Sequence, residues 1–154
     1  MHEYDIEEKR ILEVGCGIAL TSLMLNHRHA NITATDYHPE AEEFLKKNVT
    51  LNEGKAIPFT QTNWADRDSG LGKFDLIVGS DLLYERNHVE LLSTFIDQHT
   101  RQQCEVILVD PGRGHHARFS KIMLKLGYTH NQHPPKNTAY LAKPFKGKVL
   151  NYTR

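Results

Sequence analysis

Cysteine is scarce in this sequence, and no hydrophobic run is long enough to cross a membrane. Cys16 and Cys104 are isolated, so they supply neither a disulfide framework nor the paired spacing of a zinc site. A membrane-spanning helix needs about 20 consecutive apolar residues, and the N-terminal segment has no apolar stretch typical of a secretory signal. We therefore expect reduced thiols, a cytoplasmic location and no membrane partner.

The sequence also lacks internal repeats, low-complexity linkers and a net charge. A chain of 154 residues without a linker predicts one domain over residues 1–154, with a core of its own. Its charges are unevenly distributed, because residues 1–85 contain 8 basic and 15 acidic residues, whereas residues 86–154 contain 11 and 4. The acidic half either lines a mouth that favours a cationic substrate or forms a solvated face.

Two further absences limit the ligands. His115 and His116 are adjacent, but no third ligand follows at a plausible spacing, so we expect solvated histidines at a helix start and no metal. The basic stretch from Lys136 to Arg154 lacks an aromatic stacking motif. We therefore expect a solvated surface there and no nucleic-acid partner.

The segment that the rest of the chain is organised around runs from Ile11 to Asp36. An apolar run over 11–14 enters a loop with glycines at 15 and 17, a helical pattern covers 18–27, and a second apolar run over 31–35 ends on Asp36. A strand, a glycine turn, a helix, a strand and an acid are the outline of a nucleotide-binding βαβ unit.

The residue types of this unit suit a ligand that lies against the main chain. Gly15 and Gly17 can adopt backbone angles closed to other residues, and they have no Cβ to block a ligand. The helix that follows directs free N–H groups and a positive dipole end toward the same place. Asp36 lies at the position where a ribose diol needs an acceptor.

The downstream pattern predicts further strands over 57–62, 73–79 and 104–110. Helices are predicted from about 40 to 51, around 89–96 and over 115–126. This alternation favours an α/β fold with a mostly parallel sheet. In such a sheet the functional residues gather at the carboxyl ends of the strands.

The glycine loop departs from the dinucleotide fingerprint, because Leu20 stands where a third glycine belongs and Glu13 precedes the first one. A carboxylate suits a cationic ligand better than a pyrophosphate. The pattern Glu13-x-Gly15-Cys16-Gly17, the acid at 36 and the later Gly79-Ser80-Asp81 resemble S-adenosylmethionine-dependent methyltransferases of the seven-strand class. The resemblance extends from about residue 11 to residue 127.

This resemblance implies a Rossmann-like, doubly wound sheet of seven mostly parallel strands with an antiparallel strand at the C-terminal edge. It also implies that residues 128–133 and 138–143 form the last two strands, as the antiparallel edge pair of the class. It implies S-adenosylmethionine as cofactor, held by residues of the glycine loop and of the loops after the next strands: Glu13, Gly15, Cys16, Gly17, Asp36, Tyr37, Asn63, Trp64 and Ser80. In the family, a polar or acidic residue followed by tryptophan meets the adenine at the place of Asn63 and Trp64. The alternative for Trp64 is a core anchor. Tyr37 and His38, directly after Asp36, either flank the adenine or lie on the surface. The segment before the first strand is short relative to the family.

The segment Asp81-Leu82-Leu83-Tyr84 matches the D-x-x-Y pattern of the protein lysine methyltransferases called methyltransferase family 16. By that resemblance, Asp81 orients the substrate amine as a hydrogen-bond acceptor, and Tyr84 walls the pocket with a ring face that favours a cation. The structural alternative is that Asp81 caps the following helix and Tyr84 fills the core.

The leading hypothesis is therefore a protein N-methyltransferase that acts on a lysine side chain. A small-molecule methyltransferase with the same cofactor is the first alternative. A catalytically inactive binding module is the second. An NAD-dependent oxidoreductase is disfavoured by Leu20 and Glu13.

Overall fold

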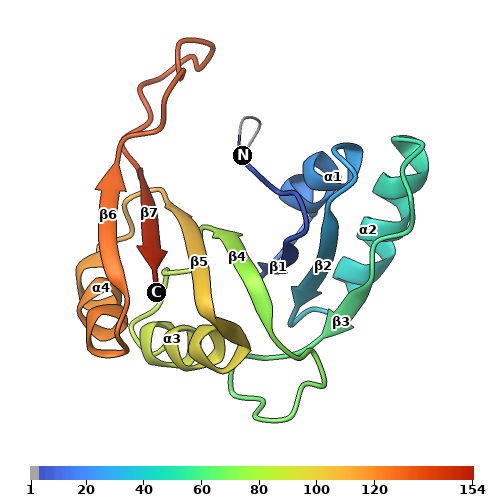
Figure 1. Cartoon of the computed structure of the whole chain (residues 1–154). Helices are drawn as coiled ribbons and strands as arrows, with labels where there is room; N and C mark the ends of the chain where they lie inside the picture. The colour runs from blue at the N-terminus through green and yellow to red at the C-terminus, as the bar shows by residue number, and fades with distance from the viewer. Residues whose placement is uncertain (1–3) are drawn as a thin grey trace.

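A computed structural model describes residues 4–154 as one twisted sheet with helices on both faces (Figure 1). The strands are β1 (Arg10–Val14), β2 (Asn31–Asp36), β3 (Phe59–Gln61), β4 (Phe74–Ser80), β5 (Thr100–Asp110), β6 (Thr129–His133) and β7 (Lys148–Thr153). The helices are α1 (Leu20–His27), α2 (Glu40–Leu51), α3 (His88–His99) and α4 (His116–Lys125). The strand order is β3-β2-β1-β4-β5-β7-β6, with β7 antiparallel to both neighbours. The predicted doubly wound α/β fold is confirmed.

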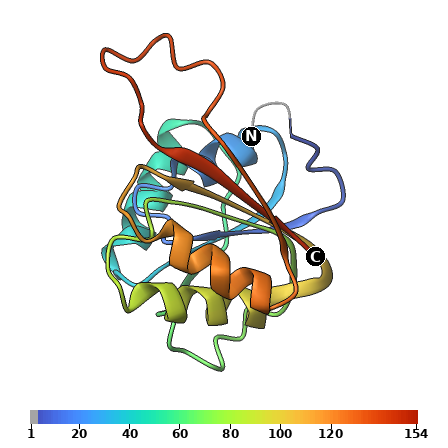
Figure 2. The same ribbon diagram turned by 90° about the vertical axis from the view of Figure 1, so that its left-hand side faces the viewer.

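The core lies on both faces of the central strands because successive residues of a strand point to opposite sides. Leu12 and Val14 of β1 pack with α3 and α4, which lie side by side beneath the sheet in Figure 2. Ile11 belongs to the opposite layer, where it is clustered with Leu25 of α1. These strands are therefore buried on both faces, as their nearly continuous apolar sequences predict.

One predicted strand is wrong. Residues 138–143 belong to a loop that projects from the sheet between β6 and β7, and the last strand is Lys148–Thr153 (Figures 1 and 2). Pro134, Pro135 and Pro144 explain the difference, because proline has no N–H to contribute to a ladder. The true strand alternates as a covered strand should, with Leu150 and Tyr152 fully buried.

Other element starts also differ from the sequence prediction, and β5 begins at Thr100 rather than at residue 104. Helix α1 begins at Leu20 rather than at residue 18, because Ala19 has a left-handed φ of 61°. Strand β3 covers only 59–61, directly after Pro58. No helix within residues 4–154 is long and apolar enough to cross a membrane.

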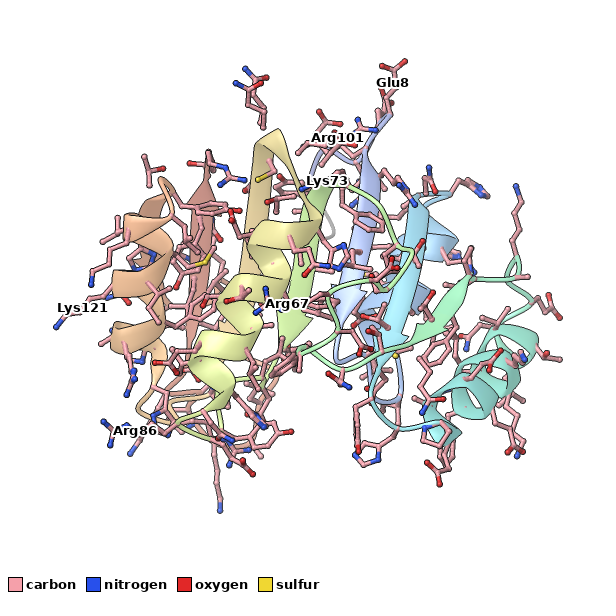
Figure 3. The ribbon with its side chains drawn as sticks, turned by 90° about the horizontal axis from the view of Figure 1, so that it is seen from below. Glu8, Arg67, Lys73, Arg86, Arg101 and Lys121 are labelled. Atoms are coloured by element: carbon pink, nitrogen blue, oxygen red, sulfur yellow. The ribbon has the colours of Figure 1, made fainter. Side chains whose placement is uncertain are left out.

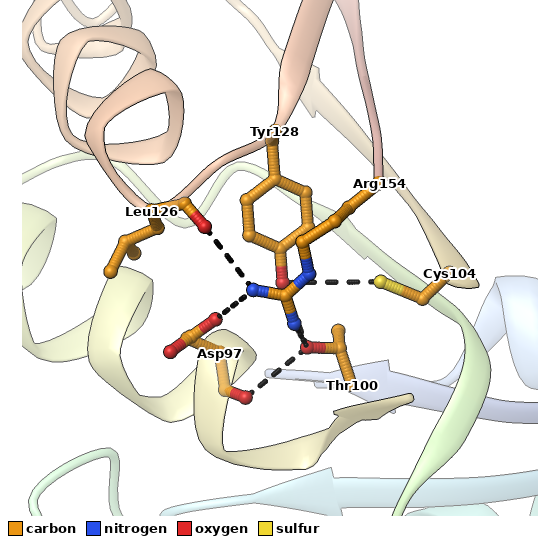
Figure 4. Close-up of polar contacts among 6 residues, drawn as sticks. All are labelled: Asp97, Thr100, Cys104, Leu126, Tyr128 and Arg154. Carbon is orange, nitrogen blue, oxygen red and sulfur yellow. Dashed lines mark hydrogen bonds and ion pairs between the residues drawn. The ribbon is translucent and has the colours of Figure 1, made fainter. Parts of the chain in front are cut away.

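The C-terminal residue ties the last strand to α3 and β5 (Figure 4). The Arg154 guanidinium donates to Asp97 at 2.6 Å and to Thr100 at 3.0 Å, and it lies 4.5 Å from the centre of the Tyr128 ring. These contacts hold the antiparallel strand in register against β5.

The two ends of the sheet carry different parts of the chain. In Figure 3, Lys73 and Arg101 mark the end where β4 and β5 begin, and Arg86 in the loop after β4 lies at the opposite end. Strands β1, β2, β4 and β5 all finish at that opposite end, which we call the carboxyl edge. The sheet order reverses there between β1 and β4, so the loops after these strands diverge and leave a crevice.

Candidate functional site

A cavity of about 530 Å³ opens at the carboxyl edge, within the range of about 300–1,000 Å³ usual for small-molecule sites. Loops after β1, β2, β3 and β4 line it, together with the start of α3. Most of the predicted site residues line this one cavity: Gly15, Asp36, Tyr37, Asn63, Trp64, Ser80, Asp81 and Tyr84. The fold therefore brings together residues that the sequence separates by some seventy positions.

The conformation of the glycine loop, residues 15–17, depends on its backbone angles and backbone hydrogen bonds. Gly15 and Gly17 have φ values of 60° and 52°, in the left-handed region that strains a residue with a Cβ. The Cys16 amide donates to the Thr35 carbonyl at 2.9 Å, and the Gly17 amide donates to the Asp36 carboxylate at 2.8 Å. The turn after β1 is thus fastened to the end of β2.

Asp36 is only 8% exposed, yet it lines the cavity. One carboxylate oxygen accepts from the Gly17 amide at 2.8 Å, and the other accepts from the His38 amide at 2.9 Å. A carboxylate has about four acceptor sites, so each oxygen retains capacity for a ligand hydroxyl. This arrangement fits the diol of a ribose.

Glu13, Cys16 and Gly17 are not among the residues that line the cavity. The Glu13 carboxylate, 4% exposed, accepts hydrogen bonds from both the amide (2.9 Å) and the hydroxyl of Ser22, in the first turn of α1. Burial raises the pKa of Glu13. Burial also raises the pKa of the Cys16 thiol to about 12, which keeps this cysteine protonated and unreactive. Glu13, Cys16 and Gly17 therefore stabilise the glycine loop from the side away from the cavity.

Asn63 and Trp64 form the wall that follows β3. The Asn63 side-chain oxygen accepts from the Ala65 amide at 2.7 Å, which leaves its amide nitrogen as the group able to donate to a ligand. Trp64 packs partly on the core and lies edge-on to His88, with ring centroids 5.3 Å apart. Trp64 therefore has both features that the sequence left as alternatives, a core contact and a face on the cavity.

Leu82 covers the glycine surface between β1 and β4. Its terminal carbons lie 2.6 Å from where a Cβ on Gly15 would be, and 2.5 Å from where one on Gly79 would be. A ligand that reaches Gly15 must therefore displace the end of a flexible leucine side chain, whereas nothing lies within 4 Å of the corresponding point at Gly17. Access to the space beside Gly15 therefore requires a different rotamer of Leu82.

Asp81 follows β4 with a left-handed φ of 56°, a strained conformation for a residue other than glycine and one that clusters at functional sites. Its carboxylate is held by Arg113 from the loop after β5, with distances of 2.8 Å from Nε and 2.6 Å from Nη2. The guanidinium lowers the pKa of Asp81, which stays ionised. Tyr84 is 53% exposed and stacks edge-on with His88 at 4.7 Å.

His38, which the sequence analysis placed beside the adenine or on the surface, lines the cavity. Several other lining residues were not predicted from the sequence: Thr62, Ala65, Leu82, His88 and Leu91. The first three adjoin predicted residues, so their proximity in sequence was an available signal. His88 and Leu91 are one helical turn apart at the start of α3, a spacing that places them on one face. Arg113 carries no such signal, because its contact joins two loops that only the fold brings together.

Comparison with known proteins assigns a family to this fold and cavity. A family model described as lysine methyltransferase matches residues 1–124, a span that includes every residue that lines the cavity. The chain belongs to the lysine methyltransferase family. The predicted resemblance is thus confirmed at the level of the family.

Individual relatives agree with this assignment. The chain is 35% identical over 101 residues to a zebrafish (Danio rerio) protein N-lysine methyltransferase, METTL21A, covering 61% of this chain and 46% of that protein. It is 32% identical over 114 residues to a rat (Rattus norvegicus) electron transfer flavoprotein beta subunit lysine methyltransferase, covering 70% and 42%. The chain thus spans less than half the length of these two relatives.

A solved structure shares the whole fold. A SAM-dependent methyltransferase from Methanosarcina mazei superposes with a TM-score of 0.77 at 15% identity, covering 99% of this chain and 95% of that one. At this identity the likeness establishes the architecture alone. Within residues 4–154, no group of three histidine, cysteine, aspartate or glutamate side chains is arranged to hold a metal ion.

Proposed function

We propose that this chain transfers a methyl group from S-adenosylmethionine to the side-chain amine of a lysine in a protein. The observation that carries the proposal is the single cavity at the carboxyl edge, which joins Asp36 to Asp81 and Tyr84 within the family match. Membership of the lysine methyltransferase family makes S-adenosylmethionine the cofactor.

The adenosine half of the cavity is suited to bind and orient the cofactor. Asp36 has spare acceptor capacity for the ribose hydroxyls, and Asn63 has an amide nitrogen for the adenine. Trp64 offers an indole against which a base can pack. When bound, the cofactor supplies the transferable methyl on a sulfonium sulfur. The roles of the individual residues are part of the proposal.

The substrate half presents an anion and an aromatic ring near the solvent. Asp81 is ionised and accepts hydrogen bonds, so it can bind the lysine ammonium. Once that group has lost a proton to water, Asp81 can orient the neutral amine for in-line attack on the methyl group, with S-adenosylhomocysteine as the leaving group. Because its pKa is lowered, Asp81 is a weak proton acceptor and acts as an orienting group. The ring face of Tyr84 favours a cation beside it.

The open geometry of this half supports a protein substrate over a small molecule. The Asp81 side chain is 43% exposed and Tyr84 is 53% exposed, so a lysine on a protein surface can reach both. An enclosed pocket above Asp81 would instead favour a small amine. We also propose that the enzyme works in the cytoplasm, since both cysteines are buried free thiols.

Incubation with labelled S-adenosylmethionine and a cell extract tests the proposal. We expect label in one or a few proteins, with methyl-lysine identified by mass spectrometry of the labelled bands. Label confined to small molecules would contradict the protein substrate. Failure to bind the cofactor in calorimetry would make the chain a binding module.

A further inference from the structure

Arg113 is paired with the carboxylate of Asp81, the group that binds the substrate amine in the proposed function. Its Nε and Nη2 atoms donate to the two different oxygens of Asp81, at 2.8 Å and 2.6 Å. This two-pronged geometry is the strongest arrangement that an arginine and a carboxylate form. A positively charged group of this chain thus already sits where a lysine ammonium would bind.

The position of Arg113 allows the pair to open. Arg113 comes from the loop after β5 and is not among the residues that line the cavity, so it reaches Asp81 from the outer side. Its side chain is 51% exposed. The loop around it has glycines at 112 and 114 with φ values of 102° and 89°, and nothing lies within 4 Å of a Cβ at either position. The guanidinium can therefore swing into solvent without disturbing the core.

We infer that Arg113 is a built-in competitor of the substrate: it pairs with Asp81 where the lysine ammonium would bind, and it must be displaced before a lysine side chain can bind there. The inference rests on the proposed function, since it takes Asp81 as the substrate-orienting group. A neutral side chain cannot replace the guanidinium without leaving the carboxylate unpaired, whereas a cation can. Arg113 thereby weakens the binding of a cationic side chain at Asp81 and leaves the binding of a neutral one of the same length unchanged.

The competition is weak, because a half-exposed ion pair is screened by water and contributes little. We therefore expect about a two- to five-fold effect on binding, rather than a block. Removing the guanidinium in Arg113→Gln leaves Asp81 free to accept from the ligand and should strengthen cation binding by that factor. Arg113→Lys retains the charge but loses the two-pronged geometry. Its affinity for a cationic ligand should therefore lie between those of the unmodified protein and of Arg113→Gln.

The test uses Nα-acetyl-lysine amide as a probe and measures equilibrium binding by NMR titration of the protein saturated with S-adenosylhomocysteine. We expect the dissociation constant for the probe to fall about two- to five-fold in Arg113→Gln. The neutral analogue Nα-acetyl-norleucine amide should bind both proteins equally. The dissociation constant of S-adenosylhomocysteine should not change.

Two control variants separate this effect from a general change in charge. Arg118→Gln breaks an ion pair with Glu90 whose partners are as exposed as those of Arg113 and Asp81. Arg86→Gln removes an exposed positive charge at the same carboxyl edge (Figure 3). Neither should alter probe binding as much as Arg113→Gln does.

Three results would overturn the inference. If Arg113 instead holds Asp81 in a productive orientation, Arg113→Gln binds the probe more weakly. If Asp81 is not the cation site, neither protein binds the probe, or both bind it equally. Loss of S-adenosylhomocysteine binding by the unmodified protein would overturn the proposed function itself, so the two failures are distinguishable.

Discussion

Asp36→Asn tests whether the end of β2 anchors the cofactor through its sugar. The substitution preserves the shape of the side chain but replaces one acceptor oxygen with an NH₂ group. That group must face either the Gly17 amide or the His38 amide, which now donate at 2.8 and 2.9 Å. Two donors then confront each other in a site that is only 8% exposed.

The size of the expected loss in cofactor affinity and in stability follows from the charge-assisted hydrogen bonds that Asp36→Asn removes. A hydrogen bond to an ionised group contributes about 1.5–3 kcal/mol, so losing one to the ribose should weaken cofactor binding roughly 10- to 150-fold. The unpaired backbone amide should also lower the free energy of unfolding by about 1–3 kcal/mol. Calorimetry with S-adenosylmethionine measures the first effect and urea denaturation measures the second.

Glu43→Gln provides the matched control, because it makes the same chemical change at an exposed carboxylate on α2 that pairs only with Lys47 within the described chain. We expect wild-type affinity and stability for this variant. A folded Asp36→Asn protein with wild-type cofactor affinity would refute the role of Asp36. In that case the ribose would have to be bound elsewhere.

Three further predictions address other parts of the site. Gly17→Val should prevent cofactor binding in calorimetry, because a β-branched residue is strained at a φ of 52° and the turn that presents Asp36 is lost; normal binding would show that this turn is dispensable. Asp81→Ala should reduce turnover at least ten-fold in a methyl-transfer assay, with the S-adenosylmethionine dissociation constant unchanged; loss of cofactor affinity would show that its role is misassigned. Burial raises the pKa of Glu13, so its contribution to stability is full below its ordinary value of 4.5 and is lost as the pH rises through the raised value. Urea denaturation over pH 4–8 should show a smaller decline in stability for Glu13→Gln, and identical slopes would contradict this reasoning.

The sequence predicted the central fold well because local pattern and tertiary environment agree there. Strands β4 and β5 are buried on both faces, so their continuous apolar runs are unambiguous. Prediction failed at the C-terminal end, where the strand over 138–143 came from the family resemblance, although prolines on both sides of this segment favour a loop. The true strand, β7, is specified by its contacts with β5 and by the Arg154 anchor, which are long-range and invisible to local pattern.

The candidate site was predictable to the extent that each residue ends a strand. Asp36, Ser80 and Asp81 could be placed at one edge because parallel strands finish together. Contacts between side chains of different loops could not be predicted from the ends of the strands. The contact between Asp81 and Arg113 depends on how two loops fold, and the cover of Gly15 by Leu82 depends on a single rotamer.

Glu13 illustrates how a correct pattern can act through a different geometry. The acid before the glycine loop suggested a carboxylate beside a cationic ligand, but its oxygen binds the Ser22 amide at the start of α1. In dinucleotide-binding folds the free amides at this helix start bind the pyrophosphate. Glu13 occupies one of them and places a carboxylate at the positive end of the helix dipole. The site is therefore unsuited to a pyrophosphate for two reasons, a donor already in use and an acid beside it, and both leave a sulfonium nucleoside unaffected.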